Sequence, residues 1–259
     1  MAADIDVQDQ DGIRLVRMNR LAKKNALTLA MYDALADALE TAADASAGLS
    51  VVVVTGGEGV YCAGNDLIDF LSIAEGGLST AQPILRLIDQ FARCPLPVVA
   101  AVDGAAVGIG ATMLLHCDVV YASPAARFQL PFVNLGLVPE AGSSLLLPRL
   151  AGLQKASELL LLGRPFTVEE AERMGLVSAI VPSADLVGHA MATAQALAEK
   201  PQGALRATKA LLRREPEPLP ARIAAEVERF DLCLRSPELR EAVAAFREGR
   251  KPDFSKTAV

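Results

Sequence analysis

The chain has 259 residues, of which 52% are hydrophobic and only 4% aromatic, with no Trp. This length allows one sizeable core, which Ala, Val, Leu and Ile must fill because aromatic residues are scarce. The net charge of −6 argues against nucleic acid as a partner, since phosphate backbones require clustered Lys and Arg.

The polar N-terminus MAADIDVQDQDG lacks the basic flank and apolar core of a signal peptide. The apolar runs along the chain are too short for a membrane span. Four well-separated cysteines show no metal-ligand spacing and are interpreted as buried, reduced thiols. We therefore expect a cytoplasmic protein with no membrane contact and no metal. The cysteines are Cys62, Cys94, Cys117 and Cys233.

Strands and helices are predicted to alternate up to about residue 181. Continuous β-branched runs indicate buried strands, and apolar residues three or four apart indicate amphipathic helices. The expected strands are Ile13–Met18, Val51–Thr55, Pro97–Val102, Val119–Ala122 and Val177–Val181. Helices are expected at residues 27–43, 66–74, about 84–91 and 108–116, and residues 75–77 are expected to break the second of these. A short helix is expected after the segment NLGLVPEAGSS. A further helix is expected to begin with a capping box formed by Thr167 and Glu170 and to end at Gly175.

Beyond Pro182 only helical patterns remain. They cover residues 184–199, 202–214, 220–235 and 237–248. Strands alternating with helices, followed by helices alone, predict an α/β core with a C-terminal helical appendage. We place the core in residues 1–200 and the helical region in residues 201–259.

Two glycine-rich turns are predicted to follow buried strands and to open helices: AGNDL at 63–67 and GAAVGIG at 104–110. Glycine lets a backbone approach a ligand closely, and free N–H groups at a helix start carry partial positive charge. Two such turns facing each other would form an oxyanion hole. Two alternatives are tight helix–strand packing alone and a dinucleotide-binding GxGxxG turn. The latter is disfavoured because ATM follows Gly108-Ile109-Gly110, so the third glycine is missing.

The segments YCAGNDL, AAVDGAAVGIGATMLLHCDVVYAS, FVNLGLVPEAGSSLLLPRLAG, LLLGRPFTVEEAERMGLV and FREGRKPDF occur in this order between residues 12 and 254. Together they resemble the crotonase (enoyl-CoA hydratase/isomerase) superfamily. The resemblance implies an α/β spiral of ββα units with a C-terminal helical trimerisation region. It also implies a homotrimer or dimer of trimers and an acyl-CoA thioester substrate. No cofactor is implied, because CoA enters as part of the substrate.

By the same resemblance, the backbone N–H groups of Asn65 and Ile109 stabilise an enolate oxygen. Hydratases of the family add two glutamates that activate water, at positions occupied here by Thr112 and Phe132, and neither can act as a base. Glu140, in LGLVPEAGSS, is similar to the acid of Δ3,Δ2-enoyl-CoA isomerases. Its alternative interpretation is an exposed loop acid or a helix cap beside Ser143.

A single carboxylate suffices for isomerisation, since it can remove a proton from C2 and return it to C4. Apolar neighbours would raise the pKa of Glu140 by desolvation if they line its pocket. The neighbours in sequence are Phe132, Leu135, Leu137, Val138 and Leu145–Leu147.

The resemblance also suggests contacts with CoA. Ala22 and Lys24, in RLAKKNAL, match a segment beside the nucleotide, although Lys24 is nearly as well explained as a solvated charge. Phe246 would contact CoA bound to a neighbouring subunit. The cluster Arg247, Arg250 and Lys251 is either a solvated helix end or a phosphate contact. The remaining expected substrate or CoA contacts are Ala63, Gly64, Asp66, Leu67, Ile68, Gly108 and Phe132.

Other polar residues are set aside. His116 is interpreted as a satisfied core histidine, and His189 as a residue on a polar helix face. A triad using Ser143 or Ser144 lacks the GxSxG elbow. The sequence thus predicts an enoyl-CoA isomerase with Glu140 as base. The alternatives are hydration or thioester hydrolysis on the same fold, and a catalytically weak acyl-CoA-binding protein.

Overall fold

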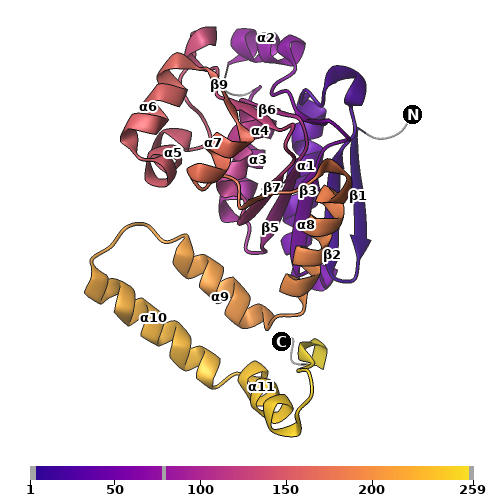
Figure 1. The fold of residues 1–259 in the computed structure, drawn as a ribbon, viewed down its shortest axis with the longest axis vertical. Coiled ribbons are helices and arrows are strands. Elements are labelled where there is room, and N and C mark those ends of the chain that lie inside the picture. The colour runs from indigo at the N-terminus through magenta and orange to yellow at the C-terminus, as the bar shows by residue number, and fades with distance from the viewer. Residues whose placement is uncertain (1–3, 78–79, 257–259) are drawn as a thin grey trace.

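A computed structural model describes residues 4–77 and 80–256, and Figure 1 shows its two sheets with helices around them. The larger sheet has the order β1-β2-β3-β5-β7-β10, and the smaller has the order β4-β6-β8-β9. In the larger sheet only β1 is antiparallel to its neighbour, and in the smaller only β9 is. The strands are β1 (Ile5–Gln10), β2 (Ile13–Met18), β3 (Val51–Thr55), β4 (Val60–Cys62), β5 (Val98–Val102), β6 (Ala105–Val107), β7 (Val119–Ala122), β8 (Arg127–Gln129), β9 (Pro165–Thr167) and β10 (Ala179–Ile180).

Both faces of the larger sheet are covered, which explains why β3 and β5 are continuously apolar. Val51 and Val53 pack in a cluster with Leu186 of α8 (Ser183–Ala198). The alternate residues Val52 and Val54 belong to the main core, with side chains of α1 (Leu29–Ala43) and α3 (Gln82–Arg93). The period of two along each strand thus divides its side chains between two helical layers.

The smaller sheet is the main difference from the sequence prediction. Residues 60–62, which were not among the predicted strands, form β4, and residues 105–107, part of the second glycine-rich turn, form β6. β1, β8 and β9 were also missed. Because β3 is followed by β4 and α2 (Leu67–Gly76), and β5 by β6 and α4 (Ile109–Thr112), the chain repeats a strand–strand–helix unit. The predicted α/β spiral is confirmed.

The remaining predicted helices are present with small shifts at their ends. The helix expected at residues 66–74 continues through residues 75 and 76, and the one expected at 108–116 divides into α4 and the 3-10 turn η3 (Met113–His116). The other predicted helices are α5 (Ser143–Ala151), α7 (Val168–Arg173), α9 (Gln202–Leu212), α10 (Leu219–Leu234) and α11 (Pro237–Glu248). Helix α6 (Leu153–Leu162) was not predicted, nor were the short 3-10 turns η1 (Leu21–Lys23), η2 (Ala45–Ala47), η4 (Val133–Leu135) and η5 (Phe254–Lys256).

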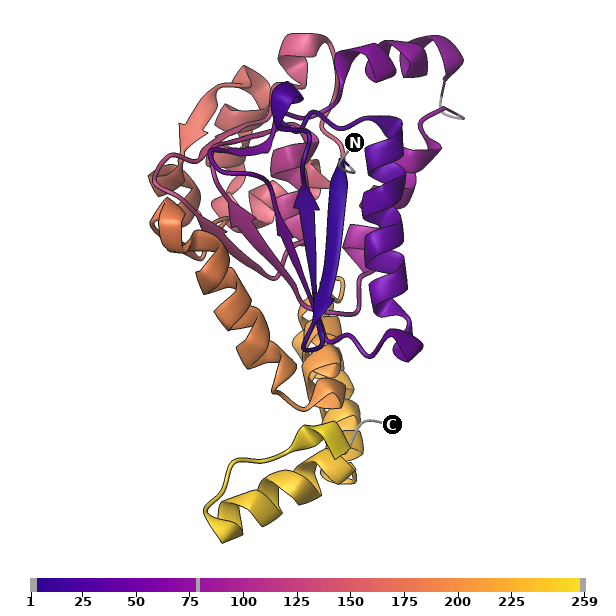
Figure 2. The ribbon, with the colours of Figure 1, turned by 90° about the vertical axis from the view of Figure 1, so that its right-hand side faces the viewer.

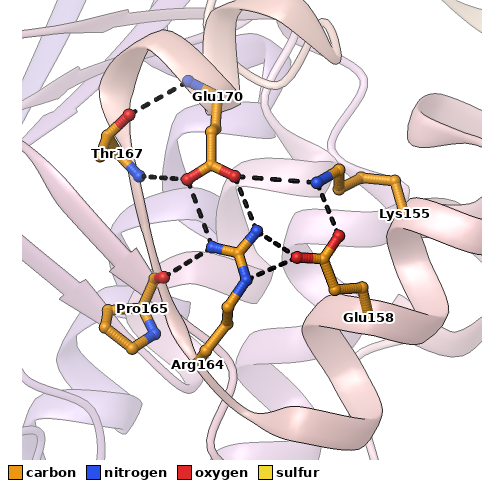
Figure 3. A network of polar contacts seen from close by, with 6 residues as sticks. All are labelled: Lys155, Glu158, Arg164, Pro165, Thr167 and Glu170. Atoms are coloured by element: carbon orange, nitrogen blue, oxygen red, sulfur yellow. Dashed lines mark hydrogen bonds and ion pairs between the residues drawn. The ribbon is translucent and has the colours of Figure 1, made fainter.

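A polar network fixes α7 and α6 to β9 (Figure 3). The predicted capping box is confirmed, since Thr167 Oγ1 accepts from the Glu170 N–H and the Glu170 carboxylate accepts from the Thr167 N–H. Arg164 lies between two carboxylates, with Nη2 2.7 Å from Glu170 Oε1 and 2.6 Å from Glu158 Oε1. Lys155 bonds the other oxygen of Glu158 at 2.7 Å.

The C-terminal helices α9, α10 and α11 extend away from the sheets (Figures 1 and 2). Side chains of α9 and of the residue after it attach this helix to the core. Lys209 Nζ lies 2.6 Å from Asp118 Oδ2, Arg213 Nη2 lies 2.9 Å from Asp118 Oδ1, and Arg206 Nη2 donates to the Leu49 carbonyl at 3.3 Å. The division at residue 200 and trimer formation stay predictions. Within residues 4–77 and 80–256, no helix is long and apolar enough to span a bilayer.

Candidate active site

The two glycine-rich turns lie side by side because β4, which precedes the first turn, is paired in parallel with β6, which lies within the second. The first turn follows β4, which was not predicted, rather than β3, whereas the second begins just after β5, as expected. A Cβ on Gly64 would lie 3.0 Å from the Val107 carbonyl oxygen. A Cβ on Gly110 would lie 2.6 Å from the Cys62 carbonyl oxygen. Glycine is therefore required at both positions for the turns to approach each other.

The backbone geometry leaves the N–H groups of Asn65 and Ile109 free. Leu27 donates to the Gly64 carbonyl and accepts from the Asp66 N–H, both at 2.8 Å, so the Asn65 N–H between them points away from Leu27. Ile109 is the first residue of α4, where an N–H has no partner inside the helix. Among the described residues neither N–H has an acceptor.

Glu140 lies in the loop between η4 and α5, and the Thr112 hydroxyl donates a hydrogen bond to its Oε1. Burial raises the pKa of Glu140 above 4.5, and the bond from Thr112 acts against this rise. No ion pair joins Glu140 to a Lys, Arg or His side chain within residues 4–77 and 80–256. The carboxylate therefore has a neutral donor and no stabilising cation.

The expected rise in the Glu140 pKa is confirmed, but most of the apolar residues proposed to cause it do not enclose the carboxylate. Leu135 and Val138 are 62% and 79% exposed, and Leu145 is 48% exposed. Instead, Glu140 faces Thr112, which is fully buried on α4. The loop next to Glu140 in sequence turns Leu135 and Val138 outward, while the hydrogen-bond partner of the carboxylate lies on α4, which is distant in sequence.

Tyr32 was not predicted as a site residue, yet its hydroxyl donates a hydrogen bond to the Asn65 side-chain Oδ1. Tyr32 lies on α1 and is fully buried. Burial raises its pKa well above 10, and the nearby Cys62 and Glu140 contribute to this rise. It is one of only three tyrosines in the chain, and its place on an otherwise aliphatic helix face was the available signal.

Comparisons with known proteins agree with this architecture. Residues 8–257 match the enoyl-CoA hydratase/isomerase family. The chain belongs to this family. A Rhodobacter capsulatus protein described as a probable enoyl-CoA hydratase is 38% identical over 251 residues, which cover 95% of each chain. Human enoyl-CoA delta isomerase 2 is 37% identical over 246 residues, which cover 93% of this chain and 62% of that protein.

The fold is shared with solved structures along nearly the whole chain. The solved structure of a Magnetospirillum magneticum AMB-1 protein, described as an enoyl-CoA hydratase/carnithine racemase, has a TM-score of 0.93 and 47% identity, and the match covers 98% of this chain and 100% of that one. The predicted membership of the crotonase superfamily is therefore confirmed.

In this crotonase the RLAKKNAL segment lies against the first turn. The Ala63 N–H donates to the Lys24 carbonyl at 3.0 Å. Arg20 Nη1 lies 2.7 Å from Asp66 Oδ2, and Asp66 also caps α2 by accepting from the Ile68 N–H at 3.0 Å. The structure thus brings Ala22 and Lys24, both exposed, next to the 63–68 turn. The Asp66 carboxylate is occupied by structural bonds.

The other residues predicted to contact the substrate or CoA do not gather around the two turns. Ile68 is 78% exposed on α2, and the side chain of Leu67 lies outside the described part of the structure. Phe132 is buried in the core. Phe246 is 88% exposed on α11, at the end of the molecule opposite α2 (Figures 1 and 2). It therefore does not join the turns of its own chain.

The residues set aside are held by structural bonds. His116 is 7% exposed and its Nε2 lies 2.8 Å from the Ala141 carbonyl oxygen, so the satisfied core histidine is confirmed. The ring of His189 packs edge-on against Tyr121. Ser143 Oγ donates to the Glu140 carbonyl at 2.7 Å.

Arg250, near the C-terminus, pairs with Glu241 at 2.5 Å, which favours its interpretation as part of a helix end.

The four cysteines are free thiols. Cys62 and Cys94 are buried as predicted, but the prediction is wrong for Cys117 and Cys233, which are partly exposed. Burial raises the pKa of the Cys62 thiol to about 12. A thiol with this pKa stays protonated at neutral pH and is a poor nucleophile. Cys62, which lies against Gly110 of the second turn, therefore offers no competing covalent chemistry.

Proposed function

We propose that this crotonase is an enoyl-CoA isomerase that converts a 3-enoyl-CoA into a 2-enoyl-CoA. The observation that carries the proposal is the environment of Glu140: a largely buried carboxylate with a raised pKa and one neutral hydrogen-bond donor. A carboxylate destabilised by burial is a stronger base, and its acid can return the proton later. The relative named enoyl-CoA delta isomerase 2 supports this reading.

The reaction needs one base and one anion-binding site. Glu140 removes a proton from C2, and the electrons of that C–H bond delocalise through the C1 carbonyl onto the thioester oxygen and through the C3–C4 double bond onto C4. The free N–H groups of Asn65 and Ile109 would donate to this oxygen, and losing one such donor typically costs roughly 10²–10³ in rate. The same Glu140 then protonates C4, which leaves the double bond between C2 and C3.

The Thr112 hydroxyl assigns separate tasks to the two oxygens of Glu140. Oε1 accepts the Thr112 hydrogen bond, so Oε2 is the oxygen left to move the proton. At the two positions where a water-activating pair of glutamates is expected in hydratases, this chain has Thr112 and Phe132. A fully buried hydroxyl and a buried phenyl ring cannot activate water as bases. This composition favours proton transfer over hydration.

The substrate contacts are part of the same proposal. Ala22 and Lys24 are exposed beside the 63–68 turn, where the Lys24 ammonium could meet the phosphates of CoA. The exposed Phe246 is too far along the molecule to reach its own turns. It would serve CoA only from a neighbouring subunit, which requires the proposed homotrimer or dimer of trimers.

Hydration is the second candidate, because a relative described as a hydratase is 38% identical. The decisive experiment incubates the enzyme with 3-enoyl-CoA and 2-enoyl-CoA in parallel, in water enriched in ¹⁸O. Isomerisation gives 2-enoyl-CoA of unchanged mass from the first substrate and no 3-hydroxyacyl product from the second. An ¹⁸O-labelled 3-hydroxyacyl-CoA as the main product would establish hydration, and labelled free acid would establish thioester hydrolysis.

A further inference from the structure

Two hydrogen bonds reach the Glu140 loop from a single helical segment. The Thr112 hydroxyl binds the Glu140 side chain, and His116 Nε2 lies 2.8 Å from the carbonyl oxygen of the next residue, Ala141. Thr112 is the last residue of α4, and His116 is the last residue of the 3-10 turn η3 that follows it. Side chains from the two ends of η3 therefore hold both the carboxylate and the backbone beside it.

The backbone held in this way has an unusual conformation. Ala141 has φ +52°, in the left-handed region that residues other than glycine rarely adopt, and Gly142 follows with φ +68°. The Glu140 carbonyl accepts from the Ser143 N–H at 3.0 Å and from Ser143 Oγ at 2.7 Å. A strained residue next to a carboxylate persists only when its surroundings hold it, and His116 is the side chain that binds its carbonyl.

The protonation of His116 follows from its partner. A carbonyl oxygen can only accept, so Nε2 carries the proton. Burial lowers the pKa of His116, and the nearby Arg213 lowers it further while the bond to Ala141 acts in the opposite direction. The ring is therefore neutral at physiological pH. Arg213 Nη2 also binds the His116 carbonyl oxygen at 2.6 Å, which fixes the backbone of His116 from α9.

We propose that His116 is a positioning residue that orients Glu140 for proton transfer by holding the Ala141 carbonyl. The inference rests on the proposed role of Glu140 as the base. His116 does not touch the reacting atoms; it sets the direction from which the Glu140 side chain leaves the backbone. Thr112 then fixes the far end of the same side chain, so the carboxylate is held at two points.

The test compares two substitutions of similar size. In His116→Gln the amide nitrogen can still donate to the Ala141 carbonyl, whereas His116→Met fills the space without a donor. We expect kcat for 3-enoyl-CoA to fall roughly 10- to 100-fold in H116M, the scale of a misplaced catalytic group. KM should stay within about twofold, because the CoA contacts are elsewhere, and H116Q should recover most of the lost rate.

His189, the only other histidine in the chain, provides the matched control. H189Q and H189M should leave kcat unchanged, since its ring packs on Tyr121, away from the loop. If H116M does not fold, His116→Asn replaces it, because the shorter amide does not reach Ala141. Equal kcat values for H116Q and the donor-lacking variant would overturn the proposal.

Hydrogen–deuterium exchange without substrate gives a readout that does not depend on the reaction. The segment 138–147 should exchange faster in the donor-lacking variant than in the wild type or H116Q, with the rest of the core unchanged. A wild-type enzyme inactive on 3-enoyl-CoA would contradict the proposed isomerase function alone. Unchanged exchange at this segment would contradict the role of His116, whatever the reaction proves to be.

Discussion

Two glutamates in this molecule have opposite surroundings. Glu140 has a neutral hydroxyl as its hydrogen-bond donor, and burial raises its pKa above 4.5. Glu170 lies near the surface in the network of Figure 3, where bonding to Arg164 lowers its pKa to about 2. Each carboxylate accepts a hydrogen bond from a side chain elsewhere in the chain. The donor to Glu140 is the neutral Thr112, whereas the donor to Glu170 is the charged Arg164.

The comparison shows what separates a candidate base from a structural link. A cation beside a carboxylate stabilises the ionised form, which makes the group a weak base and a good ion-pair partner. Burial without a cation does the reverse. Glu170 also completes the capping box of α7, so it has both of its oxygens occupied. Among the described residues, Glu140 Oε2 has no hydrogen-bond partner, which is the arrangement that proton transfer requires.

The largest expected effect comes from removing the proposed base. Glu140→Gln should lower kcat for 3-enoyl-CoA by about 10³-fold, within the usual range for general acid–base catalysis, whereas Glu170→Gln should leave kcat unchanged. Steady-state kinetics on both variants make the comparison. An E140Q enzyme that keeps most of its turnover would remove Glu140 from the mechanism.

The same substitution should stabilise the fold. Because the pKa of Glu140 in the folded protein is raised, its ionisation costs stability as the pH rises through that pKa. A neutral Gln removes this cost, so E140Q should melt at a higher temperature than the wild type at pH 8 and lose the advantage near pH 4. Thermal melts at both pH values check the sign.

The second effect concerns the oxyanion turn. Gly108 has φ 55° and ψ −121°, a conformation close to glycine-only, and a Cβ there would meet no atom within 4 Å. Gly108→Ala should therefore act through the backbone, by turning the peptide that carries the Ile109 N–H, and lower kcat roughly 10²-fold. Gly249→Ala, with φ 64° and equal space, is the control and should affect stability alone. Equal kcat values for the two variants would contradict a catalytic role for this N–H.

The third effect tests the neutral donor on Glu140. Thr112→Val removes the hydrogen bond that stabilises the ionised carboxylate, so the pKa of Glu140 should rise further. The acidic limb of the kcat–pH profile should move to higher pH, with kcat at neutral pH falling about tenfold. Thr112→Ser retains the hydroxyl and should keep the wild-type profile. Identical profiles for the valine and serine variants would contradict this assignment.

The smallest effect belongs to the charged cluster. Arg164→Gln should lower the free energy of unfolding by about 1 kcal/mol at pH 7, the scale of a partly exposed ion pair, without changing kcat. The pKa of Glu170 is lowered from 4.5 to about 2, so its stabilisation is present above pH 4.5 and is lost as the pH falls toward 2. Denaturant unfolding at pH 7 and pH 3 should show a smaller difference at pH 3.

Much of this molecule follows from local patterns. The β-branched run Val51–Thr55 predicts a buried strand, and Thr167 with Glu170 predicts a capping box, because both depend on residues adjacent in sequence. The glycines of the two turns likewise indicate where the backbone must approach another group. The three-residue strands β4, β6, β8 and β9 were missed, because so short a strand has no periodicity and forms only when its neighbours are in place.

Only the tertiary structure decided what surrounds each group. Thr112 and Glu140 are 28 residues apart, and Tyr32 meets Asn65 across 33 residues; sequence spacing carries no record of either contact. Leu135 and Leu145, close to Glu140 in sequence, are exposed, whereas its hydrogen-bond partner Thr112 comes from another element. Local sequence thus determined which residues could perform chemistry. Long-range packing determined the charge and solvation around them, and these set the pKa on which the proposed function depends.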